Sequence, residues 1–193
     1  MKITLKKIIY LIAFIGFTFS AKAQNTAVPD TARLTLGLDL GKPSGNLGNS
    51  YKFDLGASLQ YDLPLTEKFY FTANVGFDSY FPNNNVVNNP IGLENVAPAN
   101  MDLIPLRVGI KYFLIRTFYV QGEVGESYLL NKSAVYGLDS FGLTYSPQIG
   151  LLFKLHNRKY IDAGFRYEWQ QSFYGDGGYN HMLALRVAYG LNL

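Results

Sequence analysis

The sequence contains no cysteine, so the chain can form no disulfide bond, no thiolate metal site and no cysteine nucleophile. Charged residues are also scarce: they make up 16% of the 193 residues, against about 25% in an ordinary soluble domain. Tryptophan occurs once, whereas there are 15 tyrosines and 14 phenylalanines. Aromatic residues are rare in disordered chains and enriched in β-strands. The composition therefore excludes disorder, disfavours an ordinary soluble enzyme and favours β structure.

Residues 1–23 have the three regions of a cleaved secretory signal peptide. Lys2, Lys6 and Lys7 precede the apolar run 8–19, and 21–23 form a small-x-small cleavage site. The apolar run is too short for a confident membrane span, although an uncleaved anchor is the alternative. Removing this segment removes four lysines, which changes the net charge from +3 to −1 and Lys+Arg from 17 to 13 against 14 acidic residues. The remaining chain shows no basic recognition helix and no stacking platform for nucleic acid.

Residues 24–193 contain eight segments in which apolar and polar residues alternate with period two, as in β-strands with one apolar face. In the first segment, for example, Leu36 and Leu38 alternate with Thr35, Gly37 and Asp39. The predicted strands are 32–41, 52–63, 69–81, 101–113, 118–130, 139–155, 160–173 and 181–193. No stretch of this part has the length and apolar character of a membrane-spanning helix.

The connections between these strands alternate in length. Those at 42–51, 82–100, 131–138 and 174–180 are longer and rich in glycine and asparagine, whereas 64–68, 114–117 and 156–159 are short. Long loops at one end and tight turns at the other are typical of outer-membrane barrels. The pattern predicts an all-β fold, an eight-stranded antiparallel up-and-down transmembrane β-barrel, with both termini beside the short turns on the periplasmic side.

A soluble barrel with its apolar face turned inward is the alternative. The interior of an eight-stranded barrel is only just wide enough for side chains, so it could not hold the large apolar residues of eight strands. Ten glycines on the polar face would instead make room for long charged side chains in a crowded lumen. We therefore expect the apolar face to contact outer-membrane lipid, and we expect a monomer.

The segment 103–112, with sequence LIPLRVGIKY, together with the export signal and the eight strands, resembles the small outer-membrane β-barrel family that includes PorT-like proteins. The architecture is similar to OmpA- and OmpX-type barrels. The resemblance implies a bacterial outer-membrane location. Through its PorT-like members it also implies a component of an envelope assembly or protein-secretion machine, with another envelope protein as partner.

Seven basic and seven acidic residues have the parity of the polar face, and these equal numbers predict a network of ion pairs that plugs the lumen. Hairpin symmetry about Ile115 and about Arg158 predicts that Arg107 faces Glu123 and that Lys154 faces Asp162 as direct neighbours. A polar route for ions or small solutes is the alternative. The basic residues are Arg33, Lys52, Arg107, Lys111, Lys154, Arg166 and Arg186, and the acidic ones are Asp39, Asp54, Asp62, Asp78, Glu123, Asp162 and Glu168.

Three of these acids, Asp39, Asp54 and Asp78, are expected near one another towards the loop end of the lumen. Carboxylates that lie together repel unless a cation or a shared proton intervenes, and oxygen ligands suit calcium or magnesium. They form a candidate cation site. Pairing with lumen arginines is the preferred interpretation, so we expect neither a bound metal nor a cofactor.

Some eight-stranded barrels modify lipids, which makes His181 the residue to consider, with Glu126 and Gln171 at similar height. A nucleophilic site needs a serine, a histidine and an acid within hydrogen-bond reach. No serine of matching parity lies next to His181 in its strand, and Ser79 is several strands away. We therefore expect no catalytic residues.

The longest loop, 82–100, is the candidate contact surface, because Pro90 would stiffen it while Ile91 and Leu93 offer apolar area. The sequence predicts a non-enzymatic outer-membrane barrel that acts through its external loops or as a structural envelope protein. The alternatives are a component of an assembly or secretion machine, a lipid-modifying enzyme and a narrow solute pore.

Overall fold

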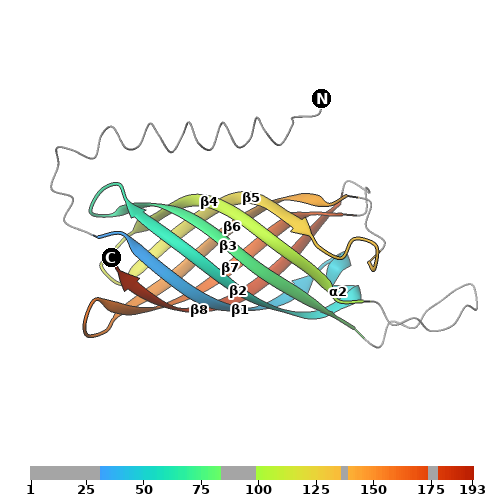
Figure 1. Cartoon of the computed structure of the whole chain (residues 1–193), viewed down its shortest axis with the longest axis horizontal. Coiled ribbons are helices and arrows are strands. Elements are labelled where there is room, and N and C mark those ends of the chain that lie inside the picture. Colours follow the sequence, from blue (N-terminus) through green and yellow to red (C-terminus); the bar gives the residue numbers. More distant parts are fainter. Residues whose placement is uncertain (1–30, 84–98, 136–138, 174–177) are drawn as a thin grey trace, which may run out of the picture.

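Eight antiparallel strands form one closed barrel in sequence order, and β8 pairs with β1 to complete it (Figure 1). The computed structural model describes residues 31–83, 99–135, 139–173 and 178–193. The predicted signal peptide and the contact-loop residues Pro90, Ile91 and Leu93 lie outside the described residues. The elements are β1 (Arg33–Ser44), α2 (Asn46–Ser50), β2 (Tyr51–Pro64), β3 (Phe69–Pro82), β4 (Met101–Phe113), β5 (Phe118–Leu129), β6 (Phe141–Lys154), β7 (Lys159–Gln171) and β8 (Tyr179–Asn192).

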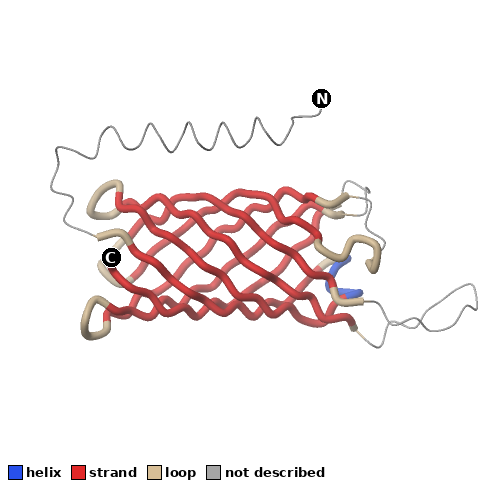
Figure 2. The backbone as a smooth tube through the Cα atoms, in the orientation of Figure 1, coloured by secondary structure: helices blue, strands red, loops and turns tan. Residues whose placement is uncertain are grey.

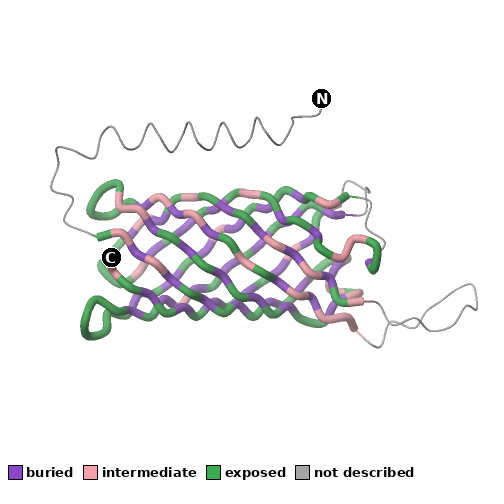
Figure 3. The backbone as a smooth tube through the Cα atoms, viewed as in Figure 1, coloured by how far each residue is buried: buried purple, intermediate pink, exposed green. Residues whose placement is uncertain are grey.

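Alternating side-chain direction explains why these sequences form a barrel. In β1, Leu36 and Leu38 point outward with 66% and 67% of their surface exposed, whereas Thr35 and Asp39 are 0% and 1% exposed. Figure 3 shows the same alternation of buried and exposed residues along the strands. The apolar face therefore points outward and the polar face lines the lumen, as predicted, and the soluble-barrel alternative is wrong.

The two ends of the barrel differ, as Figure 2 shows. One end carries the short turns between β2 and β3, β4 and β5, and β6 and β7, together with the start of β1 and the end of β8. The other end carries the longer connections, including α2, which the sequence analysis did not anticipate. Among the described residues, no helix is long and apolar enough to span a membrane.

The register corrects both predicted charge pairs. Arg107 pairs with Gly125, and Glu123 pairs with Gly109. Asp162 likewise pairs with Leu152, and Lys154 pairs with Tyr160. Neither predicted pair consists of direct neighbours, because each turn is centred one residue away from the assumed position and this displaces every cross-strand pair by two residues.

Two of the seven predicted lumen cations lie outside the lumen. Lys52 follows Tyr51 at an irregularity in the pairing of β2 with β3, which turns Tyr51 inward and leaves Lys52 exposed. Lys154 ends β6 at the turn end of the barrel and is also exposed. The lumen therefore holds five of the expected basic residues and all seven of the acidic ones. The prediction of equal numbers is therefore wrong, because the lumen holds two more acidic than basic residues of the expected set.

Candidate functional site

The turn end of the lumen is filled by an aromatic layer. It consists of Tyr70, Phe113, Tyr119, Leu152 and Tyr160, none more than 6% exposed. Arg33 lies against this layer: its Cζ is 4.3 Å from the ring centroid of Tyr70 and 5.0 Å from that of Phe113. Its Nη2 also donates a hydrogen bond of 2.8 Å to the Tyr70 hydroxyl. A guanidinium stacked on rings places a positive charge in an aromatic layer at little desolvation cost.

Next to this layer, Lys111 holds two carboxylates together. Its Nζ lies 2.7 Å from Asp62 Oδ2 and 3.3 Å from Asp162 Oδ2. Tyr119 donates a hydrogen bond of 2.5 Å to Asp162 Oδ1, and Gln148 Nε2 donates one of 2.6 Å to the Tyr119 hydroxyl. One buried ammonium group and a phenol thus stabilise two buried acids from β2 and β7.

The middle of the lumen contains an arginine network that crosses the barrel. Arg107 Nη2 lies 2.8 Å from Glu168 Oε2 and 3.4 Å from Asp78 Oδ2. Arg166 Nη2 lies 2.9 Å from Asp39 Oδ1, and Arg186 Nε lies 3.9 Å from the same oxygen. The expected lumen residues Arg107, Asp162, Arg166, Glu168 and Arg186 thus take part in ion pairs. Their partners come from opposite sides of the barrel as well as from neighbouring strands.

Glu123 does not join this ion-pair network. Its Oε1 accepts a hydrogen bond of 3.2 Å from the Thr72 hydroxyl, and no cation of the described residues lies within salt-bridge distance of it. The Arg107–Glu123 pair is therefore wrong in contact as well as in register.

A second apolar layer lies at the loop end of the lumen, and α2 contributes Leu47 to it. Tyr51, Tyr80 and Phe173 supply its rings, and all three are at most 2% exposed. The full layer consists of Leu47, Tyr51, Tyr80, Met101, Leu103, Leu129, Val135, Phe173, Met182 and Ala184. The charged network thus lies between two layers of buried, mostly apolar side chains, an arrangement that the sequence pattern alone did not indicate.

Asp54 lies beside this second layer and is unlike the other lumen acids. It is 0% exposed, and neither of its carboxylate oxygens has a hydrogen-bond partner. Its neighbours in the ladder are Gly41 and Tyr80. Pairing with arginines, the preferred interpretation, thus holds for Asp39 and Asp78 but not for Asp54. Within the described ranges, no group of three or more His, Asp or Glu residues could hold a metal ion, so the structure does not assemble the candidate cation site.

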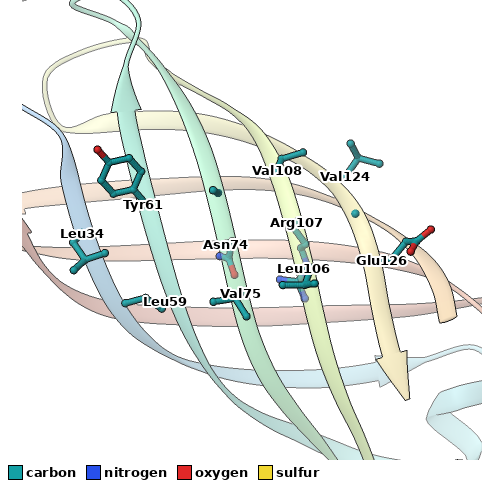
Figure 4. A pocket seen from close by; sticks show the side chains of 12 residues that line it. Leu34, Leu59, Tyr61, Asn74, Val75, Leu106, Arg107, Val108, Val124 and Glu126 are labelled. Carbon is teal, nitrogen blue, oxygen red and sulfur yellow. The ribbon is translucent and has the colours of Figure 1, made fainter. Parts of the chain in front are cut away.

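The exterior carries an apolar depression of about 550 Å³ over β1 to β5 (Figure 4). Leu59, Val75, Leu106 and Val108 line it, and Glu126 lies at its edge (Figure 4). Glu126 is exposed on the apolar face, with Leu106 and Leu143 as its neighbours in the ladder. Such a shallow apolar surface suits an acyl chain rather than a polar substrate.

The residues considered for catalysis do not meet. His181 on β8 forms a hydrogen bond of 2.7 Å between its Nδ1 and the hydroxyl of Tyr167 on β7. The His181 ring also stacks against Trp169, with 6.4 Å between the ring centroids. Ser79 donates a hydrogen bond of 2.6 Å to Asp102 Oδ1 on β3 and β4. These strands are not neighbours in the barrel. The Gln171 side-chain oxygen instead accepts a hydrogen bond from the backbone N–H of Leu143 on β6. Ser79 and His181 therefore cannot act as one nucleophilic site in this arrangement.

Comparison with known proteins identifies the fold. No family model matches the sequence, and no curated protein matches it. Neisserial surface protein A has a similar structure, with 13% identity, a TM-score of 0.57, and coverage of 84% of this chain and 97% of that one. The outer-membrane protein Ail of Yersinia pestis, in a phospholipid bilayer nanodisc, shows 16% identity, a TM-score of 0.51, and coverage of 84% and 99%. The chain has the fold of the small eight-stranded outer-membrane β-barrels.

Proposed function

We propose that this protein is a non-enzymatic outer-membrane barrel with a closed lumen, which acts through its external loops or as a structural protein of the bacterial envelope. The observation that carries the proposal is the enclosure of a charged network between two apolar layers, inside a barrel whose exterior is apolar.

The exterior supports a membrane location. Leu36 on β1, Leu106 on β4, and Leu185 and Val187 on β8 expose 58–66% of their surfaces. Soluble monomers rarely expose a contiguous apolar patch larger than a few hundred Å². A closed barrel satisfies the backbone hydrogen bonds of its strands internally, which is the condition for spanning lipid with β structure. The two fold relatives are surface or outer-membrane proteins by name, which agrees with this location.

The interior supports a structural role for the charges. Ion pairs such as Arg107–Glu168 and Lys111–Asp62 join strands that are not neighbours, and their side chains are at most 2% exposed. A permeation route would need polar surface that continues to both ends, whereas apolar layers cover the network at each end. A catalytic role would need an accessible nucleophile and base within reach of each other, and Ser79 and His181 lie apart.

The longer connections are the proposed contact surface, and Pro90, Ile91 and Leu93 of the loop 82–100 are its candidate contact residues. Loops carried on a rigid scaffold are frequent sites of recognition. Under this proposal the short turns and both termini are periplasmic and the longer connections face the cell exterior.

Single-cysteine labelling tests location and orientation without background, because the natural chain has no cysteine. Ser133→Cys lies in the connection after β5, and Thr117→Cys lies in the turn between β4 and β5; both positions are exposed. A membrane-impermeant maleimide should label Ser133→Cys in intact cells and should label Thr117→Cys only after the outer membrane is opened. Labelling of Thr117→Cys alone in intact cells would reverse the orientation. If both variants are labelled equally, and the labelled protein is recovered only in the inner-membrane fraction, the outer-membrane location is refuted.

A role in an assembly or secretion machine is the alternative that the PorT-like resemblance implies. Photocrosslinking separates it from the first proposal. Crosslinks to an envelope protein from positions 66 and 117 in the turns would favour the machine. Crosslinks confined to loop positions such as Ser133 would favour a surface contact protein.

A further inference from the structure

The turn end of the barrel carries a concentration of positive charge. Every exposed charged residue that the structure describes there is basic except Glu67. The basic residues are Lys68 in the first turn, Arg116 in the second, and Lys154, Arg158 and Lys159 around the third. We name these five the basic turn ring. None of them forms an ion pair with another described residue.

The opposite end shows no such excess. Lys42, Lys52 and Lys132 are balanced there by Asp102, Glu126 and Asp139 among the described residues. The positive field is thus confined to one end of the molecule. The turns that carry it lie two strands apart, which at about 4.8 Å per strand is about 10 Å. This spacing is close to the Debye length at physiological ionic strength, so the fields of adjacent turns overlap.

The basic turn ring is held on ordered backbone. The Lys68 carbonyl accepts a hydrogen bond of 2.9 Å from Phe113 N, which ties the first turn to the end of β4. The Thr117 carbonyl accepts one of 2.7 Å from Leu152 N, and the Arg158 carbonyl accepts one of 2.8 Å from Asn192 N. Each turn is thus joined to the next strand pair, which fixes the backbone positions from which the basic side chains extend.

The same turns expose apolar side chains, which identifies the environment of the ring. Leu65, Leu114, Ile115 and Leu155 are 40–63% exposed. Just inside them, Phe153 is 49% exposed on the outer face. Aromatic and leucine side chains next to lysines and arginines are characteristic of the boundary between acyl chains and headgroups, where long basic side chains extend their charges to the headgroups. A purely aqueous acidic partner would not require this apolar rim.

We propose that the basic turn ring binds anionic lipid headgroups of the membrane leaflet that surrounds the short turns, and that it selects them over zwitterionic headgroups. The inference rests on the proposed membrane insertion but not on which leaflet the turns face. Phosphate groups of phosphatidylglycerol-type lipids would accept hydrogen bonds from Arg116 and Arg158 and would attract the three lysines. The ring would thereby also fix the depth of the barrel in the bilayer.

Lipid selectivity in nanodiscs tests this proposal. The probes are spin-labelled phosphatidylglycerol and spin-labelled phosphatidylcholine, and the readout is the fraction of each that the protein immobilises. The natural chain should prefer the anionic probe by about fivefold, the effect of roughly one effective cation at the surface. The preference should weaken in 1 M salt, where the Debye length is about 3 Å.

Matched triple variants locate the effect. Lys68→Gln, Arg116→Gln and Lys159→Gln together remove one cation from each turn, whereas Lys42→Gln, Lys52→Gln and Lys132→Gln remove the same charge from the loop end. The turn variant should lose at least half of the preference and the loop variant should keep it, while Glu67→Gln should increase it.

Equal immobilisation of the two probes by the natural chain, or an equal loss in both triple variants, would overturn the proposal. Absence of any immobilised lipid would instead refute membrane insertion itself. Binding of a soluble acidic peptide without lipid preference would assign the ring to a protein partner.

Discussion

Arg107 on β4 and Glu168 on β7 form an ion pair across the lumen, with 2.8 Å between Nη2 and Oε2, although two strands separate them along the sheet. Both side chains are at most 2% exposed. The pair therefore joins opposite walls of the barrel through its interior. Arg107 also lies 3.4 Å from Asp78 on β3, so one guanidinium compensates two buried acids.

Replacing Arg107 by methionine should destabilise the barrel strongly. Glu168 would keep only Arg166 at 3.7 Å, and Asp78 would lose its ion-pair partner. Breaking a buried pair by removing one member costs about 3–5 kcal/mol, because the other charge stays buried. Urea unfolding in lipid vesicles, followed by tryptophan fluorescence, measures the loss.

Lys52→Met is the matched control, because Lys52 has the same predicted parity but is exposed. It should change the unfolding free energy by no more than about 0.5 kcal/mol. The double variant Arg107→Met/Glu168→Met should recover part of the stability. Equal effects of Arg107→Met and Lys52→Met would show that the cross-lumen pair does not support the barrel.

The strands could be predicted from sequence because their signal is local. Period-two alternation needs only a residue and its neighbours, and the eight predicted ranges agree with the observed strands to within three residues at each end. The inward position of Arg166, Arg186 and Glu168 followed from the same parity. No long-range information was needed for either result.

The register could not be predicted, because it depends on the geometry of each turn. In the turn between β6 and β7, Asn157 and Arg158 both have left-handed backbone, with φ of 59° and 62°. This places the centre of the hairpin at Asn157 rather than at Arg158, so Lys154 faces Tyr160. The pairing irregularity after Tyr51 had a similar effect on Lys52. Neither feature has a strong signal in the sequence.

The contacts of the lumen depend on closure of the whole barrel. Hairpin symmetry considers only adjacent strands, whereas Arg107–Glu168 and Arg166–Asp39 each join strands that are not neighbours in the barrel. The apolar layer at the loop end was missed for a different reason. Leu47 lies in a connection that the sequence marked only as polar and glycine-rich, and the short helix α2 turns it inward.

The proposed closed lumen predicts that the barrel does not conduct ions. Purified protein in a planar lipid bilayer should give no steps above background at 100 mV in 1 M KCl, because apolar layers cover the charged network at both ends. An open porin inserted under the same conditions is the positive control. Reproducible single-channel steps from the natural chain would establish a pore and contradict the proposed closed lumen.

Two glycines of β5 should respond oppositely to the same substitution. A Cβ at Gly125 would collide with the backbone carbonyl of Leu106 on β4, whereas a Cβ at Gly122 would meet nothing within 4 Å. Gly125→Ala should therefore cost about 1–3 kcal/mol of unfolding free energy through forced backbone shifts. Gly122→Ala should be neutral or stabilise by up to about 1 kcal/mol, because it reduces the entropy of the unfolded strand. Equal effects in urea unfolding would show that β4 and β5 do not approach each other as closely as the structure has them.

Asp54 and Asp39 provide a further pair of opposed variants. Asp39 accepts hydrogen bonds of 2.9 Å from Arg166 and 2.8 Å from Ser58, whereas neither oxygen of Asp54 has a partner. Asp39→Asn should destabilise the barrel, because it leaves buried arginines without full compensation, by about 3 kcal/mol. Asp54→Asn should instead leave the unfolding free energy nearly unchanged, because a buried carboxyl group without partners takes up a proton and the amide then replaces a neutral group of the same shape. The measurement is the unfolding free energy of both variants in urea at neutral pH, with and without 5 mM calcium. If Asp54→Asn is as destabilising as Asp39→Asn, and only when calcium is present, then Asp54 has a cation as its partner and bound metal neutralises part of the excess of acids in the lumen.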